Sequence, residues 1–257
     1  MTELIKFIQL VFVKVSLNLK AEAARSYLSY LWWLLEPVLF VSIMYLVFGV
    51  FLARGGDGFV AFLVCGNIPF LWFSKSVSNS CNSITQGRGL ISQVKINKAF
   101  FPLVIVGQDL VKQSVVFIML LLFLTYTGVK PAESWLYITF IVLVQLGFVV
   151  TCSLFVAAVA PIFPDFRYLV VTGLQLLMFG SGIFYSYEEV LLEEHRHIFL
   201  LNPMANIINS YRDVLLEHTV PDLTYLTSMF MVCVVLSLLL LFFFEKKNSM
   251  YSKLVVE

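Results

Sequence analysis

The chain has 257 residues, of which 60% are hydrophobic and only 13% are charged, and its mean hydropathy is +0.91. Soluble domains are about half apolar and about a quarter charged, so this composition excludes an ordinary water-soluble fold. The net charge of +1 gives no reason to expect a nucleic acid as partner. The four cysteines stand singly, without metal-ligand spacing, and we interpret them as buried thiols.

The N-terminal segment, residues 4–28, has the pattern of an amphipathic helix. Apolar side chains recur at helical steps, while three lysines and an arginine occupy other positions around the turn. Such a helix is expected to lie in the membrane interface. Because lysines interrupt the apolar run and no small-residue cleavage site follows, we do not expect a signal peptide.

Six apolar blocks follow, each long enough to cross a hydrocarbon core about 30 Å thick as a helix of about 20 residues. They cover residues 33–53, 59–77, 101–129, 135–160, 169–187 and 223–244. We predict an all-α integral membrane protein with about six transmembrane helices. Since no internal repeat or low-complexity segment divides the sequence, residues 1–257 are expected to form a single domain.

The positions of lysine and arginine predict the orientation, because these residues are retained on the cytoplasmic side. If the N-terminus is inside, twelve of the 17 Lys and Arg residues are cytoplasmic, four are outside, and Lys112 lies within the third block. Both termini are therefore expected in the cytoplasm.

Two segments between the blocks are not expected to span the membrane. The cytoplasmic segment 86–98 is basic and is predicted to form a short helix that contacts a cytosolic partner. The outer segment 188–215 gathers acidic residues and two short apolar stretches joined by Asn202 and Pro203. We predict two half-helices that dip back toward the membrane as a partial plug. Irregular backbone at that depth must be buried in protein or line a cavity, so a plug implies a pathway.

Three stretches together resemble the membrane subunits of type-2 ABC exporters for O-antigen, capsule and teichoic-acid polymers. They are RSYLSYLWWLLEPVLFVSIMYLVFGVF at 25–51, ISQVKINKAFFPL at 91–103 and NPMANIINSYRDVL at 202–215. Ser29 and residues 181–185 depart from the pattern common in that family. The resemblance implies a homodimer of this chain in the bacterial inner membrane, with two copies of a separate ATPase. It also implies export of undecaprenyl-diphosphate-linked polysaccharide to the periplasm.

The sequence supports a separate ATPase, because it contains no GxxxxGK[ST] phosphate loop. We therefore expect no cofactor in this chain, with ATP and Mg²⁺ held by the partner. A cluster in the outer segment could bind a divalent metal: Glu193, Glu194, His195 and His197. Because no further ligand accompanies these residues, we interpret the cluster as a solvated outer loop.

Arg25 and Lys20 lie just before the first block, at the level of lipid headgroups. Arginine offers a two-pronged donor to phosphate oxygens, so the resemblance implies that these residues recruit the lipid diphosphate. The alternative is that both are retention charges whose side chains reach headgroups. Asp109 and Lys112, three residues apart in the third block, share a helical face and are expected to neutralise each other. Glu36 beside Pro37 is interpreted in the same way or as an interfacial residue.

Two helical stripes indicate a translocation path for sugar. Aromatic faces can stack on sugar rings without demanding one hydrogen-bond pattern, and polar groups can exchange hydrogen bonds with hydroxyls. The stripe on the first block is Tyr30, Trp33, Phe40, Met44, Phe48 and Phe51, and that on the fifth is Tyr168, Thr172, Gln175, Phe179 and Gly182. We predict a path between these spans at the dimer axis. The alternative is that the aromatic residues pack on neighbouring helices or form interfacial belts.

Two further sets of residues are assigned by side of the membrane. The set predicted to couple to the ATPase is Arg88, Lys95, Lys98, Asp165 and Arg167. The set predicted to form the outer gate is Asn202, Pro203, Tyr211 and Arg212.

Two other functions remain open at the level of sequence. The same architecture can export another amphiphile, such as a drug or a lipo-oligosaccharide. A polyprenyl-phosphate glycosyltransferase or acyltransferase is the alternative from a different class, but the loops carry no recognisable catalytic motif.

Overall fold

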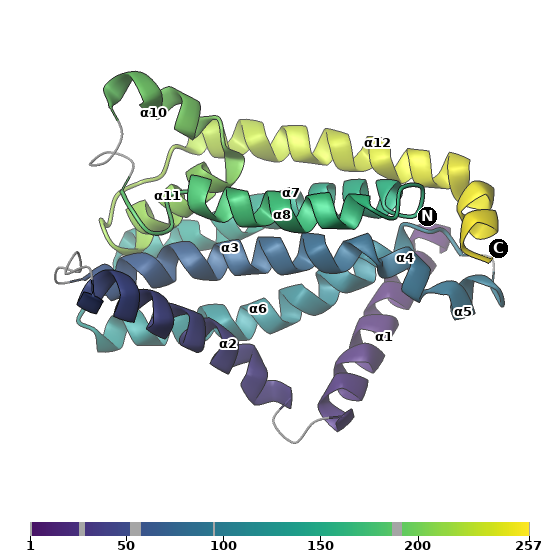
Figure 1. Ribbon diagram of the computed structural model, residues 1–257, viewed down its shortest axis with the longest axis horizontal. Helices are drawn as coiled ribbons and strands as arrows, with labels where there is room; N and C mark the ends of the chain where they lie inside the picture. Colours follow the sequence, from purple (N-terminus) through teal and green to yellow (C-terminus); the bar gives the residue numbers. More distant parts are fainter. Residues whose placement is uncertain (1, 26–28, 52–57, 95, 187–191, 257) are drawn as a thin grey trace.

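A computed structural model of the chain describes residues 2–25, 29–51, 58–94, 96–186 and 192–256, and within these ranges it contains helices and turns but no strand. Helices α3, α6, α7, α8 and α12 run roughly along one axis (Figure 1). Both ends of the chain lie at one end of this bundle, which we call the terminal end. Helices α10 and α11 lie at the other, which we call the distal end (Figure 1).

Within the described residues, four helices are long and apolar enough to cross a membrane. They are α3 (Phe59–Cys81), α6 (Phe100–Tyr126), α7 (Ile138–Val159) with the preceding 3₁₀ turn η2 (Glu133–Tyr137), and α12 (Leu223–Val256). The second, third, fourth and sixth predicted blocks are thus confirmed as long apolar helices. Helix α12 continues well past Phe244, because the charges that follow end the apolar run without interrupting helical hydrogen bonding.

The first and fifth predicted blocks correspond to shorter helices, so the count of six spans stays a prediction. The first is α2 (Ser29–Met44), which continues as the π-helix η1 (Tyr45–Phe51). A π-helix bonds five residues apart, so the stripe predicted to run on to Phe51 at α-helical steps is wrong beyond Met44. The fifth is α8 (Phe166–Gly180). It ends before the predicted boundary because Gly182 adopts a left-handed conformation with φ +68°.

Helix α1 (Thr2–Arg25) leads from the terminal end away from the bundle axis, and α2 returns toward the distal end, so the two form a V (Figure 1). We call α1 and α2 the arm, and the remaining helices the body. Helix α1 packs along α6, and α2 packs against α3. The predicted apolar stripe is Leu4, Ile8, Val11, Val15 and Leu19, and it is only partly covered, because Val15 is buried whereas Ile8 is 45% exposed. The interfacial position of α1 stays a prediction.

At the terminal end, residues 86–98 do not form the single short helix that the sequence predicted. Two one-turn helices, α4 (Ser83–Gln86) and α5 (Arg88–Ile91), are separated at Gly87 and followed by turns. Gly87 lies directly against Phe101, where an added Cβ would come within 2.1 Å of the ring. An apolar cluster of α1, α4, α5, α6, α7 and α12 fills this end of the bundle.

At the distal end, the two predicted half-helices exist and meet at the predicted residues. They are α10 (Glu193–Leu200) and α11 (Pro203–Leu215). The Asn202 side chain accepts from the Met204 amide at 3.0 Å, and Pro203 occupies the first turn, where its missing N–H costs nothing. Helix α11 packs against α3 and α7, and most of its residues are buried. Re-entry into the membrane stays a prediction.

Candidate functional site

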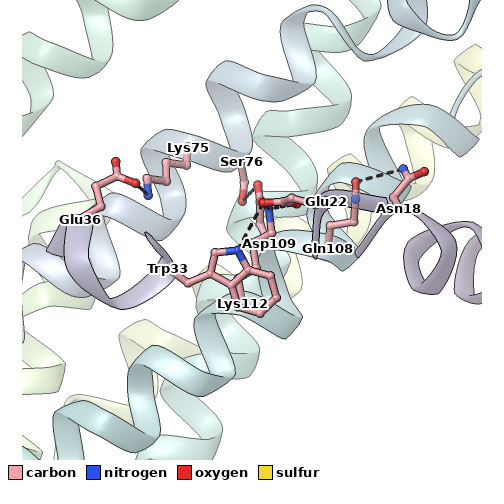
Figure 2. Close-up of polar contacts among 9 residues, drawn as sticks. All are labelled: Asn18, Glu22, Trp33, Glu36, Lys75, Ser76, Gln108, Asp109 and Lys112. Carbon is pink, nitrogen blue, oxygen red and sulfur yellow. Dashed lines mark hydrogen bonds and ion pairs between the residues drawn. The ribbon is translucent and has the colours of Figure 1, made fainter. Parts of the chain in front are cut away.

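A cluster of charged side chains lies where the arm meets α3 and α6 (Figure 2). Lys112 Nζ of α6 lies 2.7 Å from Glu22 Oε2 and donates to Oε1 at 2.8 Å. Lys75 of α3 forms a second ion pair with Glu36 of α2. Each pair therefore joins a lysine of the body to a carboxylate of the arm.

The other members of the cluster hold these groups in place (Figure 2). Asp109 accepts a hydrogen bond from Ser76 Oγ at 3.0 Å, which links α6 to α3. Trp33 Nε1 donates to Glu22 at 3.3 Å, and its ring centroid lies 5.5 Å from Lys112 Nζ, within cation–π range. The sequence predicted Asp109 to neutralise Lys112. Asp109 does interact electrostatically with Lys112, but the ion pair of Lys112 is with Glu22. The arm supplies a second carboxylate that the spacing within α6 could not show.

These side chains line a cavity of about 330 Å³ between arm and body. Its walls also include Trp32, Trp72, Asn79 and Gln113. Ionisable groups within membrane-spanning helices are costly unless they are paired or face an aqueous cavity, and they mark functional sites by default. The cavity thus brings two ammonium groups, Lys75 and Lys112, together with three carboxylates, Glu22, Glu36 and Asp109.

The residues predicted to recruit a lipid diphosphate lie near this cavity but do not form it. Helix α1 ends at Arg25, whose side chain lies outside the described part of the structure. Lys20 is exposed. Glu22, between them in the sequence, lines the cavity, and sequence reasoning missed it. Lys75 was counted only as a cytoplasmic charge, although it lies six residues before the end of α3. The sequence feature that could have revealed the ion pair of Lys75 was the opposite charge of Glu36, near the edge of the neighbouring predicted span.

The predicted path residues of α8 all lie on exposed surface of the single chain: Tyr168, Thr172, Gln175 and Phe179. Helix α8 packs against α3 and α7, with Leu174 buried. On α2, Phe40 is half-buried, and Trp33 lies in the arm cavity rather than beside α8. Tyr30 and Met44 have side chains outside the described part. Both α2 and α8 contact α3, and the two stripes are not brought together within one chain.

Three of the predicted coupling residues are exposed at the terminal end. Arg88 lies in α5, and Asp165 and Arg167 lie at the start of α8. Lys98 does not fit the prediction, because it is only 2% exposed and its Nζ donates to the Ile96 carbonyl at 3.0 Å. Burial lowers the pKa of the Lys98 ammonium. Lys95 lies outside the described residues.

The predicted gate residues Asn202 and Arg212 converge on the turn that follows α8. Asn202 Nδ2 donates to the Gly180 carbonyl at 3.2 Å and to Ser181 Oγ at 2.9 Å. Arg212, which is 5% exposed, donates to the carbonyls of Gly182 at 2.7 Å and Ile183 at 3.0 Å. It also donates to the carbonyl of Phe62 in α3 at 3.3 Å. These bonds tie α11 to the end of α8.

Tyr211, also predicted as a gate residue, is fully buried and anchors helices instead of lining a surface. Its hydroxyl donates to Gln145 Oε1 at 2.8 Å, and Gln145 Nε2 donates to the Pro69 carbonyl at 2.8 Å. Sequence reasoning missed Gln145, although a glutamine within the apolar sequence of α7 was a visible signal. Glu193, His195 and His197, which we interpreted from the sequence as part of a solvated outer loop and not as a metal site, have side chains outside the described part of the structure.

Long apolar helices and a paired charged cluster within them define an integral membrane protein. Residues 22–216 match the family described as ABC-2 type transporter, and the chain belongs to this family. It is 29% identical to the O-antigen export system permease protein RfbA of Myxococcus xanthus, over 98% of this chain and 97% of that protein. It is 25% identical to two proteins of the same description from Klebsiella pneumoniae, over 96% of this chain and 95% of each relative. The family resemblance seen in the sequence is confirmed.

Proposed function

We propose that this chain is the membrane-spanning permease subunit of an ATP-driven exporter of O-antigen polysaccharide. The observation that carries the proposal is its similarity, over nearly the whole length, to permease proteins whose names describe O-antigen export. In this proposal the glycan is linked to undecaprenyl diphosphate and moves from cytoplasm to periplasm. It passes through a homodimer in the inner membrane, with six spans in each copy and cytoplasmic termini.

The direct test is surface display of polymer. The chain is expressed with its ATPase in cells that make lipid-linked O-polysaccharide but lack their own exporter, and O-antigen is measured with antibody on intact cells. We expect surface polymer from the pair and none from the ATPase alone. Polymer that stays in the cytoplasm, while another amphiphile or a drug is expelled, would assign the chain a different cargo.

In the proposed assembly two copies of a nucleotide-binding subunit dock at the terminal end. Exposed Arg88 and Arg167 at that end support this proposal, and short helices there can pass a rigid-body push to the spans that follow. Cysteines at Arg88 and Arg167 should crosslink to the ATPase, whereas a cysteine at Lys130, between η2 and the distal end of α6, should not. Crosslinks from Lys130 alone would reverse the proposed topology.

In the proposed homodimer the exposed face of α8 lines the path. Thr172 and Gln175 support this, because polar groups facing lipid are costly, whereas sugar hydroxyls can pair with them. A protein with Gln175→Ala and Phe179→Ala should export polymer more slowly while keeping its basal ATP hydrolysis. Leu176→Ala, on the same helix, is the matched control. Unchanged export by the double variant would place the path elsewhere.

A further inference from the structure

The charged cavity continues into an apolar groove along the same three helices. The groove, about 310 Å³, runs between α2, α3 and α6 and is lined almost entirely by aliphatic and aromatic side chains. Pro37, Ile68 and Val116 line both spaces, so cavity and groove are one cleft with a charged part and an apolar part. A ligand that fills both must have a polar head and a long apolar tail.

The two parts of the cleft lie at different depths. Lys75 is six residues, or about 9 Å of helix, from the terminal end of α3. The groove extends the other way, past Val64 to Val60 near the distal end of α3 and along α6 to Phe123. With the terminal end in the cytoplasm, the head lies toward the cytoplasmic surface, and the groove leads the tail past the middle of α3 toward its distal end. A ligand that fills the cleft therefore needs a tail longer than one leaflet, which a long isoprenoid chain provides.

The charges of the cluster are divided between arm and body in a way that selects an anionic head. Glu22 and Glu36 belong to the arm, whereas Lys75 and Lys112 belong to the body. With both carboxylates in place the cavity has no surplus positive charge for an anion. When the arm carboxylates leave, the body offers two ammonium groups against Asp109 alone, so one positive charge is left over in the cavity. The Ser76 hydrogen bond holds Asp109 in place without cancelling its charge.

The ion pairs can be reached from outside the chain. The side chains of Lys75 and Glu36 are 40% and 55% exposed, and those of Lys112 and Glu22 are 24% and 40% exposed. Because an unpaired ammonium at membrane depth is costly, an arm carboxylate leaves only when another anion takes its place. A diphosphate carries more negative charge than one carboxylate and offers more acceptor oxygens, so it competes well for both ammonium groups.

We propose that this cleft binds the lipid end of the substrate, with the diphosphate on Lys75 and Lys112 and the isoprenoid chain in the apolar groove. Glu22 and Glu36 are internal stand-ins for the phosphates. Their displacement breaks the two ion pairs between arm and body but leaves the packing of α1 on α6 and of α2 on α3. Occupancy of the cleft therefore loosens the junction between the arm and the body. The inference rests on the proposed function, because that function supplies a polyprenyl diphosphate as the ligand.

The test relies on opposite changes in affinity: replacing the lysine of an ion pair should weaken binding, and replacing its glutamate should strengthen it. The full exporter in phosphatidylcholine nanodiscs is titrated with radiolabelled undecaprenyl diphosphate that carries no sugar. Lys75→Gln and Lys112→Gln should each weaken binding about tenfold or more, the loss expected for a charge-assisted hydrogen bond. Glu22→Gln and Glu36→Gln should tighten binding several-fold. Lys130→Gln, a lysine outside the cleft, should bind as the unaltered protein does.

The groove is tested separately by filling it. Met119→Trp adds bulk to the groove wall and should weaken binding, whereas Met231→Trp, at an exposed position of α12, should not. Uncharged polyprenol should bind much more weakly than the diphosphate, and phosphatidylglycerol should compete poorly.

Three results would overturn the proposal: lysine and glutamate variants that shift affinity in the same direction, no effect of either, or equal competition by phosphatidylglycerol. Binding is measured without export. If the binding predictions fail while the unaltered pair still displays O-antigen on the cell surface, only this lipid site is refuted. Failure of the unaltered pair to display O-antigen removes the proposed function, whatever the binding result.

Discussion

The fully buried Gln145 links three helices, and its replacement gives a quantitative test of the packing between α3, α7 and α11. Gln145 of α7 donates to Pro69 of α3 and accepts from Tyr211 of α11. Gln145→Leu keeps a similar volume but deletes both bonds and leaves the buried Tyr211 hydroxyl without this acceptor. Hydrogen bonds between membrane helices average about 0.6 kcal/mol and reach about 1.7 kcal/mol, and an orphaned buried polar group costs about 1–3 kcal/mol. Two bonds of average strength and one orphaned hydroxyl together predict that Gln145→Leu lowers the unfolding free energy by about 2–4 kcal/mol.

A double-mutant cycle makes the reasoning refutable. Tyr211→Phe alone should cost about 1 kcal/mol, since it deletes one bond and keeps the ring. The double variant should be no less stable than Gln145→Leu, because phenylalanine removes the orphaned hydroxyl. Unfolding by denaturant in mixed micelles provides the measurement, with exposed Gln175→Leu as the control, expected within about 0.5 kcal/mol of the unaltered protein. Losses that add to within about 0.5 kcal/mol would show that the two side chains do not interact.

Two further predictions concern single residues. Gly66→Ala places a Cβ 2.6 Å from Arg212 Nη2, so the guanidinium must shift. The unfolding free energy should fall by about 1–3 kcal/mol. Gly173→Ala is the control, because the space around its Cβ is open, and it should leave stability unchanged or raise it. Equal losses from the two glycine variants would contradict this. Lys98→Met should stabilise the protein at neutral pH, because burial lowers the pKa of Lys98 in the folded state and its buried charge carries a penalty. As pH rises through that lowered pKa, the folded protein sheds the proton before the unfolded chain does, so the advantage of methionine should shrink. Denaturation midpoints measured from neutral to alkaline pH check this, and an advantage that grows with pH would refute it.

The sequence predicted the structure well wherever the surrounding lipid alone determines the conformation of a segment. A long apolar window must become a helix in lipid, so α3, α6, α7 and α12 were visible without any knowledge of their neighbours. The break at Asn202 and Pro203 was also visible, because a capping side chain followed by proline specifies a helix start locally. The ends of α8 and of the basic segment depend on Gly182 and Gly87, whose conformation or close contacts are set by packing.

The candidate site shows where single-helix reasoning fails. Lys112 was recognised as a charge within a span, but its partner Glu22 lies 90 residues away on a helix assigned to the interface. Periodicity shows which face a residue occupies and gives no information on which helix covers that face. The same holds for Gln145 and Tyr211, which lie 66 residues apart and meet only because α11 packs on α7.

The C-terminal turns of α12 give the terminal end a brace. Tyr251 is fully buried and donates its hydroxyl to the Ala158 carbonyl, near the end of α7, at 2.7 Å. The same helix contacts α5, beside the exposed Arg88. A force applied at α5 is therefore transmitted both to α6, which follows α5 in the chain, and to α12, which contacts α5. Removing the last turns would leave the bundle its apolar spans but make the terminal end, where we propose that the nucleotide-binding subunits dock, less rigid.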